Sequence, residues 1–318
     1  MKALRFSQTG SLDDLALTDV DTPTAGEGEV LVRVEAAGVN PSDLKNLFGR
    51  YPFTTVPRVP GRDLAGIVEE GPAHLKGKAI WASPQGVGYT RDGSHAEYVV
   101  VPVEAVALKP EALSFAQAAA VGVPWITAWE GVERSGITAG TNVLVIGASG
   151  AVGQAMVQLA VARGARVLGA VRREAQLAEV PAGAEPLLLG EPDTFPERLK
   201  AQCAEGAEVV VDTTGFWLAP AVEVLARHGR IVAISAPPSG TTDMPILAFY
   251  RQSGTLVGVN SLLRSSAECG EMLTHIGTLF DSGDLPMPAA PNEWALADGP
   301  KAYRALDAGG AGKIVLIP

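Results

Sequence analysis

The segment TNVLVIGASGAVGQAMVQLAVARGARVLGAVRR, residues 141–173, determines the class of fold. Residues 143–146 are apolar, as in a strand that is buried on both faces. A helix is predicted over 151–162 and a second buried strand over 166–171. Between the first strand and the helix stand regularly spaced glycines, Gly147, Gly150 and Gly153. The order strand, glycine turn, helix, strand predicts one βαβ unit with a right-handed crossover.

A glycine turn in this position has the properties of a dinucleotide site. One glycine permits the tight turn, one allows backbone amides to approach a pyrophosphate, and one lets the helix pack closely on the strand. The first helical turn adds free N–H groups and the positive end of the helix dipole. Any tight turn favours glycine, so the location between a strand and a helix carries the argument. Backbone contacts to the pyrophosphate are predicted for Ser149, Gly150, Ala151 and Val152.

The end of the second strand indicates which dinucleotide is bound. Units that bind NAD carry an Asp or Glu there, which holds the ribose 2′-hydroxyl. This chain has Arg172 and Arg173 instead, and its first acidic residue is Glu174. Two guanidinium groups can hold a 2′-phosphate through charge-assisted, bidentate hydrogen bonds. NADPH is therefore the predicted cofactor, and a solvated basic turn is the alternative explanation.

Composition and charge limit the classes of protein. The chain has 318 residues, of which 47% are hydrophobic, and this suits two domains with large cores. No run reaches the length of a membrane span, and the N-terminal segment lacks the apolar core of a signal peptide. The two cysteines, Cys203 and Cys269, favour a reducing cytoplasm over a disulfide framework. The net charge of −10 argues against binding to nucleic acid or to an anionic membrane.

The rest of the chain predicts two domains of different classes. Residues 1–115 are rich in short strands and turns and are typical of a small barrel or sandwich. Ser114 is predicted to cap a helix, with Gln117 in the capping-box position, and a second helical stretch covers 125–134.

After Arg173 strands and helices alternate, which predicts a doubly wound parallel sheet. A last strand over 313–317 is predicted to return to the first domain. The other predicted elements are strands over 208–212, 230–235 and 255–259 and helices over 220–226, 267–281 and 300–308.

Several segments resemble the medium-chain dehydrogenase/reductase superfamily, and in particular its zinc-lacking NADPH:quinone oxidoreductase, or zeta-crystallin-like, branch. The likeness covers nearly the whole chain in order: AAGVNPSDLKNLFGRY (36–51), VPGRDLAGIVEEG (59–71), DGSHAEYVVVP (92–102), LSFAQAAAVGVPWITAWEGV (113–132), VLVIGASGAVG (143–153) and GKIVLIP (312–318). The resemblance implies an α/β protein with a GroES-like catalytic domain, residues 1–125 and 263–318, and a Rossmann NADP-binding domain, residues 126–262. It also implies an interdomain cleft for NADPH and a homodimer or homotetramer.

Zinc-dependent members of this superfamily carry a Cys where Asn40 stands and a His where Arg62 stands, together with a four-cysteine lobe. This chain has two cysteines, and its four histidines show no paired ligand spacing, so no metal is predicted. The chemistry then rests on hydride from NADPH and on groups that polarise the substrate oxygen. Quinones and conjugated enones suit such a site because they accept hydride readily.

The resemblance and the side-chain chemistry assign four residues to catalysis, Asn40, Asp43, Tyr51 and Thr127. Asn40 is predicted to donate an amide N–H to the substrate carbonyl or to touch the nicotinamide ribose, unless it is only a turn residue. Asp43 either orders a hydrogen-bond network or caps a helix. Tyr51 aligns with a tyrosine that lines the quinone site of relatives, although Lys45 replaces the family's other tyrosine there. Thr127 matches a threonine whose hydroxyl approaches the nicotinamide, and the alternative is a buried threonine that bonds to the backbone of its own helix.

Further residues are predicted to contact the cofactor because they follow strand ends of the Rossmann domain or match the family. With Asn40 and Thr127 they are Ser149, Gly150, Ala151, Val152, Arg172, Arg173, Thr213, Thr214, Ser235, Ala236, Val259, Asn260 and Lys313. Val259 and Asn260 resemble the segment that bonds the nicotinamide carboxamide, and no role is assigned to Lys313. Arg50 and Arg62 are expected to be surface charges, with contact to an anion as the alternative, and His95 is expected to serve strand packing.

These features predict an NADPH-dependent oxidoreductase that transfers hydride to a quinone or conjugated enone without zinc. An alkenal or enoyl double-bond reductase is the nearest alternative, and it would need a group such as Tyr51 to protonate the α-carbon. A non-catalytic NADPH-binding protein, either a sensor or a structural protein, is the second alternative. The predicted partners are the small-molecule substrate and further copies of the chain, without nucleic acid or membrane. The predicted location is the cytoplasm.

Overall fold

The structure is a computed structural model that describes residues Met1–Pro318. The chain divides into two compact units. Unit 1 comprises residues 1–126 and 262–318, and unit 2 comprises residues 127–261. Unit 1 is therefore built from both ends of the chain and unit 2 from its middle. No helix has the length and apolar character needed to cross a membrane.

Unit 2 contains a parallel sheet of six strands in the order β10-β9-β8-β11-β12-β13. Counted from β8, this is the order 3-2-1-4-5-6 of a doubly wound dinucleotide-binding fold. The predicted Rossmann sheet is thus confirmed. Its strands are β8 Asn142–Ile146, β9 Arg166–Val171, β10 Ala184–Leu188, β11 Ala207–Asp212, β12 Leu225–Ala233 and β13 Thr255–Gly258.

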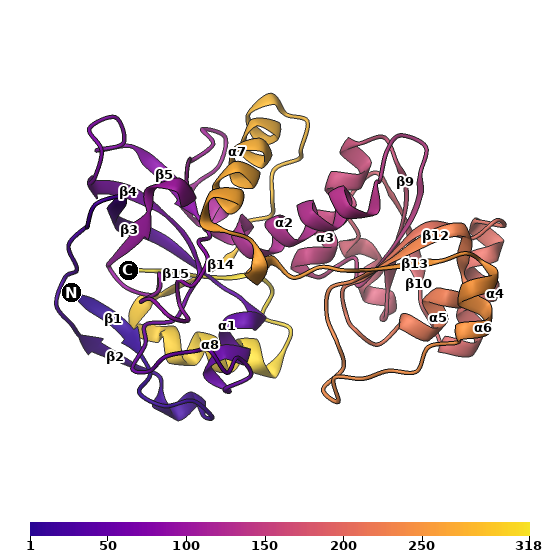
Figure 1. The fold of residues 1–318 in the computed structure, drawn as a ribbon, viewed down its shortest axis with the longest axis horizontal. Coiled ribbons are helices and arrows are strands. Elements are labelled where there is room, and N and C mark those ends of the chain that lie inside the picture. Colours follow the sequence, from indigo (N-terminus) through magenta and orange to yellow (C-terminus); the bar gives the residue numbers. More distant parts are fainter. The chain divides into compact units, whose positions relative to one another are not determined.

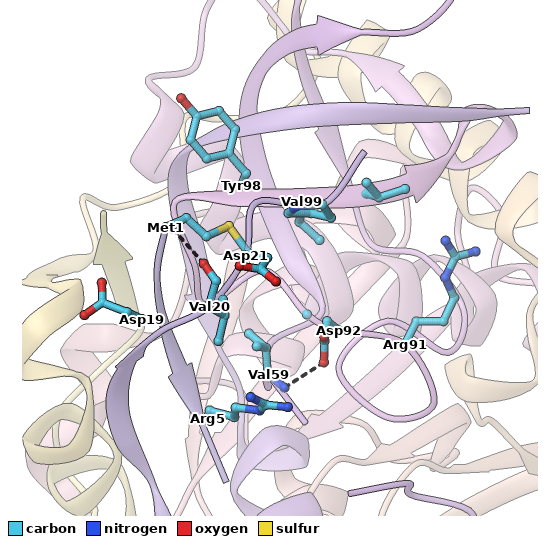
Figure 2. Close-up of a pocket in the computed structure, with 13 residues that line it drawn as sticks. Met1, Arg5, Asp19, Val20, Asp21, Val59, Arg91, Asp92, Tyr98 and Val99 are labelled. Carbon is cyan, nitrogen blue, oxygen red and sulfur yellow. Dashed lines mark hydrogen bonds between the residues drawn. The ribbon is translucent and has the colours of Figure 1, made fainter. Parts of the chain in front are cut away.

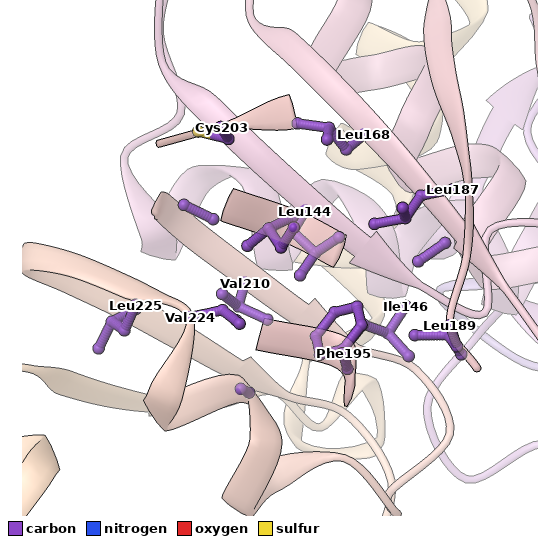
Figure 3. Close-up of a cluster of buried hydrophobic side chains, with 14 of the residues drawn as sticks. Leu144, Ile146, Leu168, Leu187, Leu189, Phe195, Cys203, Val210, Val224 and Leu225 are labelled. Carbon is purple, nitrogen blue, oxygen red and sulfur yellow. The ribbon is translucent and has the colours of Figure 1, made fainter. Parts of the chain in front are cut away.

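Both faces of this sheet are apolar, because alternate residues of each strand point to opposite sides and helices cover each side. On one face Leu144 and Ile146 of β8 pack in a core with Phe195 of α4 (Figure 3). On the other face Met156 of α3 lies against Gly131 of α2. The helices that contribute to the unit are α2 Phe115–Ser135, α3 Ala151–Ala162, α4 Phe195–Gln202, α5 Leu218–Glu223 and α6 Ile246–Arg251.

Unit 1 contains a mixed sheet in the order β14-β15-β3-β4-β5-β7, and β6 also pairs with β3. The predicted last strand is β15, Ile314–Ile317, which pairs antiparallel with β3, Glu29–Val39, so the C-terminal strand lies beside an N-terminal one (Figure 1). This β-rich, GroES-like class is as predicted. The other elements are β1 Lys2–Arg5, β2 Ala16–Asp19, β4 Asp63–Glu70, β5 Ala79–Ala82, β6 Tyr98–Pro102, β7 Val106–Leu108, β14 Asn292–Ala295, α1 Pro41–Leu47, α7 Ser266–Ser282 and α8 Gly299–Ala308.

The two helices predicted before the glycine turn form one element, α2, with a kink at Gly122 (φ 1°, ψ −113°). The predicted cap at Ser114 is confirmed. Its hydroxyl accepts a hydrogen bond from the N–H of Gln117 at 3.1 Å, and Gln117 Oε1 accepts one from the N–H of Ser114 at 3.1 Å. Beyond the kink the N–H of Val123 donates to a side chain, Asp63 Oδ1, at 2.8 Å.

The predicted helix over 220–226 is wrong at its C-terminal end, because α5 ends at Glu223 and β12 begins at Leu225. Leu225 pairs with Ala207 of β11, and its side chain is buried in the core of unit 2. Joining the sheet and removing a leucine side chain from water outweighs the small helical preference of this residue. β12 also ends at Ala233, earlier than predicted.

The third glycine of the turn should not tolerate a side chain. A methyl group on Gly153 would overlap the carbonyl oxygen of Gly147, whereas one on Gly150 would lie 3.4 Å from the same oxygen, an ordinary contact. We expect Gly153→Ala to lower the free energy of unfolding by about 1–3 kcal/mol, as overpacking does, and Gly150→Ala to stay near the wild-type value. Calorimetric unfolding measures both, and equal midpoints for the two variants would contradict the close packing.

Candidate active site

The carboxyl end of β8 carries the predicted pyrophosphate turn. Gly147 has a φ of +82°, and its carbonyl accepts a hydrogen bond from the N–H of Gly150 at 3.0 Å. Gly150 is the N-cap of α3. Gly150 and Ala151 are exposed, and Ser149 and Val152 are half-buried. The positive end of this helix is thus open to an anion.

The turn lies where the strand order reverses, between β8 and β11, which is the position at which doubly wound sheets bind ligands. Thr213 and Thr214 follow β11 and reach the turn. A Cβ atom on Gly147 would lie 3.0 Å from Thr214 Cγ2 and would overlap Thr213 Oγ1. Thr213 Oγ1 also donates to the carbonyl of Ile146 at 2.8 Å. The structure therefore brings these two predicted segments together.

Asp212, the last residue of β11, organises this loop and was missed by the sequence analysis. Its Oδ1 accepts hydrogen bonds from the N–H and hydroxyl of Thr214 at 2.8 and 2.7 Å and from the N–H of Gly215 at 3.0 Å. Its Oδ2 accepts one from the N–H of Trp217 at 2.9 Å. Gly215 in turn lies against Ala236, whose backbone a Cβ there would meet at 2.7 Å. An Asp before Thr-Thr-Gly is a turn signal that could have identified this residue.

The remaining predicted residues of unit 2 follow the next strands or lie on α2. Ser235 follows β12, and Val259 and Asn260 follow β13, so all three stand at the carboxyl edge of the parallel sheet. Val259 is buried and Asn260 is exposed. Thr127 Oγ1 donates to Ser261 Oγ at 3.1 Å, which ties α2 to the segment after β13.

Arg172 and Arg173 directly follow β9, the neighbour of β8 in the sheet. Both side chains are exposed, and neither guanidinium has a hydrogen bond or ion pair within the chain. Glu174 begins a short 3-10 helix, Glu174–Glu179. The two positive charges are therefore available to an external anion.

In unit 1 the predicted residues Asn40 and Lys313 meet at a carboxylate that the sequence analysis missed, Asp63. Lys313 Nζ donates to Asn40 Oδ1 at 2.6 Å and lies 3.8 Å from Asp63 Oδ2. Asn40 Nδ2 donates to the same Asp63 oxygen at 2.8 Å. Both ends of the Asn40 amide are thereby fixed, and one amide hydrogen remains for another acceptor.

Asp63 is fully buried and receives further donors on its other oxygen. Ser83 Oγ donates to Oδ1 at 2.7 Å, and the N–H of Val123 donates to the same atom at 2.8 Å. A Cβ on Gly122 would lie 2.6 Å from Asp63 Oδ2, so the α2 kink leaves room for this carboxylate only with glycine. Asp63 thus caps the part of α2 that follows the kink.

Asp43 has the helix-capping role that was one of its two predicted functions. Its Oδ2 accepts a hydrogen bond from the N–H of Asn40, the N-cap of α1, at 2.8 Å. Burial raises the pKa of Asp43 to about 7, and the nearby charge of Asp63 raises it as well. The carboxyl group therefore retains its proton well above the usual range of an aspartate.

Tyr51 belongs to an aromatic group with Phe53 and Tyr89. Its ring centroid lies 5.7 Å from that of Phe53 and 5.3 Å from that of Tyr89, which it meets edge-on at 85°. Tyr89 is buried, whereas Phe53 is 50% exposed. Burial, and secondarily the charge of Asp43, raises the pKa of Tyr51, so it remains a phenol at neutral pH.

The expectation that Arg62 is a surface charge is wrong, because this side chain is 1% exposed. Its Nε donates to the carbonyl of Pro84 at 3.0 Å, and its Nη2 donates to Cys269 Sγ at 3.4 Å. A buried guanidinium needs such acceptors to offset its loss of water. Arg50 is exposed, as expected.

His95 is buried and is held by two hydrogen bonds. Its Nε2 donates to the carbonyl of Gly38 at 3.1 Å, since a carbonyl can only accept, and its Nδ1 therefore accepts from the Tyr303 hydroxyl at 3.0 Å. Burial lowers the pKa of His95 to about 4, so the ring is neutral. These contacts are those of a packed structural residue.

Two sequence families match the chain. The family described as zinc-binding dehydrogenase matches residues 151–277, and the alcohol dehydrogenase GroES-like domain matches residues 26–111. A zinc-type alcohol dehydrogenase-like protein of Schizosaccharomyces pombe is 36% identical over 89% of this chain and 86% of its own length. A quinone oxidoreductase of Lama guanicoe is 30% identical over 100% of this chain and 97% of its own length. The chain belongs to the medium-chain dehydrogenase/reductase superfamily.

Other members of the superfamily show the same likeness. An NADPH-dependent alkenal/one oxidoreductase of Arabidopsis thaliana is 33% identical over 74% of this chain and 62% of its own length. The quinone oxidoreductase of Thermus thermophilus, whose structure is also known in complex with NADPH, is 34% identical with a TM-score of 0.84 over 100% of both chains. The predicted resemblance is thus confirmed, and this medium-chain reductase is a quinone oxidoreductase-like enzyme.

Two further observations concern possible ligands of this medium-chain reductase. No three or more His, Cys, Asp or Glu side chains are grouped so that they could hold a metal ion. A hollow of about 510 Å³ in unit 1 is lined by charges of both signs, among them Arg5, Asp21 and Asp92 (Figure 2). None of the predicted site residues lines this hollow.

The raised pKa of Asp43 predicts how the stability of this reductase depends on pH. Between about pH 4 and 7 the unfolded chain releases the Asp43 proton that the folded protein retains. The free energy of unfolding should therefore fall as pH rises through this window, by up to about 1.4 kcal/mol per pH unit. The variant Asp43→Asn lacks this contribution. Urea unfolding from pH 4 to 8 should show the wild-type value falling relative to the variant up to pH 7 and running parallel above it.

Asp19→Asn is the matched control, because the hydrogen bond from Lys2 Nζ at 2.7 Å lowers the pKa of Asp19. A lowered pKa has the opposite sign, so any stability from Asp19 is lost as pH falls. Parallel pH profiles for wild type and Asp43→Asn would show that Asp43 is ionised in the folded protein.

Proposed function

We propose that this enzyme transfers hydride from NADPH to a quinone or a conjugated enone without zinc. The observation that carries the proposal is the Asn40 amide, which Lys313 and Asp63 hold at both ends and which keeps one hydrogen for a substrate oxygen. Its position corresponds to a metal ligand in zinc-dependent members of the superfamily. A fixed hydrogen-bond donor can polarise a substrate carbonyl without a Lewis acid.

The residues of unit 2 fit a phosphorylated dinucleotide. The open N-terminus of α3 and the exposed turn at Gly150 suit a pyrophosphate. Arg172 and Arg173, which have no partner within the chain, suit a ribose 2′-phosphate. The rest of the cofactor would lie at the carboxyl edge of the sheet, which carries Thr213, Thr214, Ser235, Ala236, Val259 and Asn260. Thr127 of α2 is bonded to Ser261, which follows the last of these residues. When bound, NADPH supplies the hydride.

The residues of unit 1 would act on the substrate. Asn40 would donate its remaining amide hydrogen to the oxygen that gains charge, and Lys313 and Asp63 would keep the amide in that orientation. Tyr51, a phenol at neutral pH, would add a second donor or hold the ring of the substrate. Asp43 would act as a positioning residue, since it holds the backbone of Asn40. Quinones and enones need no stronger activation than this.

Reduction of an alkenal or enoyl double bond is the alternative substrate class. It is supported by the Tyr51 hydroxyl, which carries a proton that could be delivered to the α-carbon, and by the likeness to the plant alkenal/one oxidoreductase. A non-catalytic NADPH-binding role would leave the remaining amide hydrogen of Asn40 without a use. We also propose that further copies of the chain are its partners and that it acts in the cytoplasm.

Preference for NADPH should depend on the two arginines after β9. We expect Arg172→Ala/Arg173→Ala to weaken NADPH binding by about tenfold or more, because charge-assisted hydrogen bonds to the 2′-phosphate are lost. NADH binding should change little. Fluorescence titration of metal-stripped protein with each cofactor measures this, and Arg227→Ala, an exposed arginine near the start of β12, is the control. Equal binding of both cofactors by the wild type would overturn the arginine argument, and binding of neither would overturn the proposed enzyme.

Catalysis should need Asn40 and no metal. We expect metal-stripped wild type to oxidise NADPH with a quinone or a conjugated enone at the rate of untreated protein. Asn40→Ala should lower kcat by about 100-fold, as loss of one donor to a developing oxyanion does. A panel of quinones, enones and alkenals, followed by NADPH absorbance, separates the two substrate classes. Loss of activity on chelation that zinc restores would contradict the zinc-independent mechanism.

A further inference from the structure

The side chain of Gln176 connects two turns that follow different strands. Its Nε2 donates to Ser149 Oγ at 3.0 Å, and its Oε1 accepts a hydrogen bond from the N–H of Arg173 at 3.1 Å. Ser149 belongs to the glycine turn after β8, and Arg173 follows β9. Gln176 itself is half-buried in the 3-10 helix Glu174–Glu179. One neutral side chain thus ties the predicted pyrophosphate turn to the predicted 2′-phosphate turn.

The direction of these bonds follows from chemistry. The backbone N–H of Arg173 can only donate, so the atom that faces it is the amide oxygen of Gln176. The amide nitrogen must then face Ser149, whose hydroxyl oxygen acts as the acceptor. Because a serine hydroxyl has a single hydrogen, this arrangement leaves that hydrogen free to donate to an anion. By donating to Ser149 Oγ, Gln176 therefore orients the serine hydroxyl so that it can act as a hydrogen-bond donor.

The same side chain positions the arginines. Its bond to the N–H of Arg173 fixes the backbone at the N-cap of the 3-10 helix, from which Arg172 and Arg173 project with no partner inside the chain. A glutamate at position 176 would keep this bond but would add a negative charge beside the arginines. It would also accept a hydrogen bond from Ser149, which would turn the serine hydroxyl away from the 2′-phosphate that the two arginines would hold.

We propose that Gln176 is a positioning and specificity-determining residue that joins Ser149 and the Arg172–Arg173 pair into one anion site for a dinucleotide with a phosphorylated ribose. This inference rests on the proposed function, since it assumes that unit 2 binds NADPH. It adds a residue whose amide, rather than a charge of its own, favours NADPH over NADH.

The test compares Gln176→Glu with wild type by titration with NADPH, NADH and 2′,5′-ADP. We expect NADPH and 2′,5′-ADP to bind about tenfold more weakly to the variant, and NADH to change by less than about threefold. Gln202→Glu is the control for the added charge. Gln202 lies near the start of β9, at the opposite end of this strand from Arg172 and Arg173, where its carbonyl accepts a hydrogen bond from Arg166. This control should bind both cofactors as wild type does.

A second measurement separates positioning from a general structural effect. In a Ser149→Ala background Gln176→Glu should weaken NADPH binding by clearly less than it does alone, because part of its effect passes through the serine hydroxyl. Equal weakening of NADPH and NADH, or fully additive losses in the double variant, would overturn the role of Gln176 while leaving the proposed function intact. Failure of the wild type to bind either cofactor would overturn the proposed function and this inference together. Thermal midpoints confirm that every variant is folded.

Discussion

The buried carboxylate of Asp63 is the constraint on which the predicted substrate-binding part of unit 1 depends. A carboxylate removed from water needs donors on both oxygens. The amide of Asn40 serves one oxygen, the hydroxyl of Ser83 and the N–H of Val123 serve the other, and Lys313 places a positive charge 3.8 Å away. These donors come from segments that are distant in the sequence. One buried group therefore fixes the start of α1, the kinked part of α2 and the approach to β15 with respect to one another.

The fold of unit 2 was predictable because its signals are local. The glycine turn, the apolar strands beside it and the helix between them lie within one short segment, and α3 and β9 have the predicted bounds. The boundary between α5 and β12 was not predictable in this way. Whether Leu225 extends a helix or begins a strand depends on Ala207 of the neighbouring strand, which the local pattern does not contain.

The sequence allowed candidate site residues to be named, but it did not indicate the hydrogen bonds that hold them. Asn40, Asp43 and Lys313 could be named from the resemblance, and the residues after each parallel strand from the topology. Asp212 was missed although all its donors lie within five residues and the Thr-Thr-Gly after it is a turn signal. Asp63 was missed because its side-chain donors are far away in the chain. Arg62 was placed on the surface for the same reason. Its acceptors, Pro84 and Cys269, come from separate parts of unit 1.

The pairing of β15 with β3 has a consequence for the order in which the two units can fold during synthesis. Translation produces Asn40 and Asp63 early, then the whole of unit 2, and Lys313 only afterwards. The strands of unit 2 are contiguous and can associate as they leave the ribosome, whereas unit 1 must close a loop that spans an entire domain. The Asn40 amide, which we propose contacts the substrate, thus gains its hydrogen bond from Lys313 last. The nucleotide-binding sheet of unit 2 can therefore form before the candidate substrate site of unit 1 is complete.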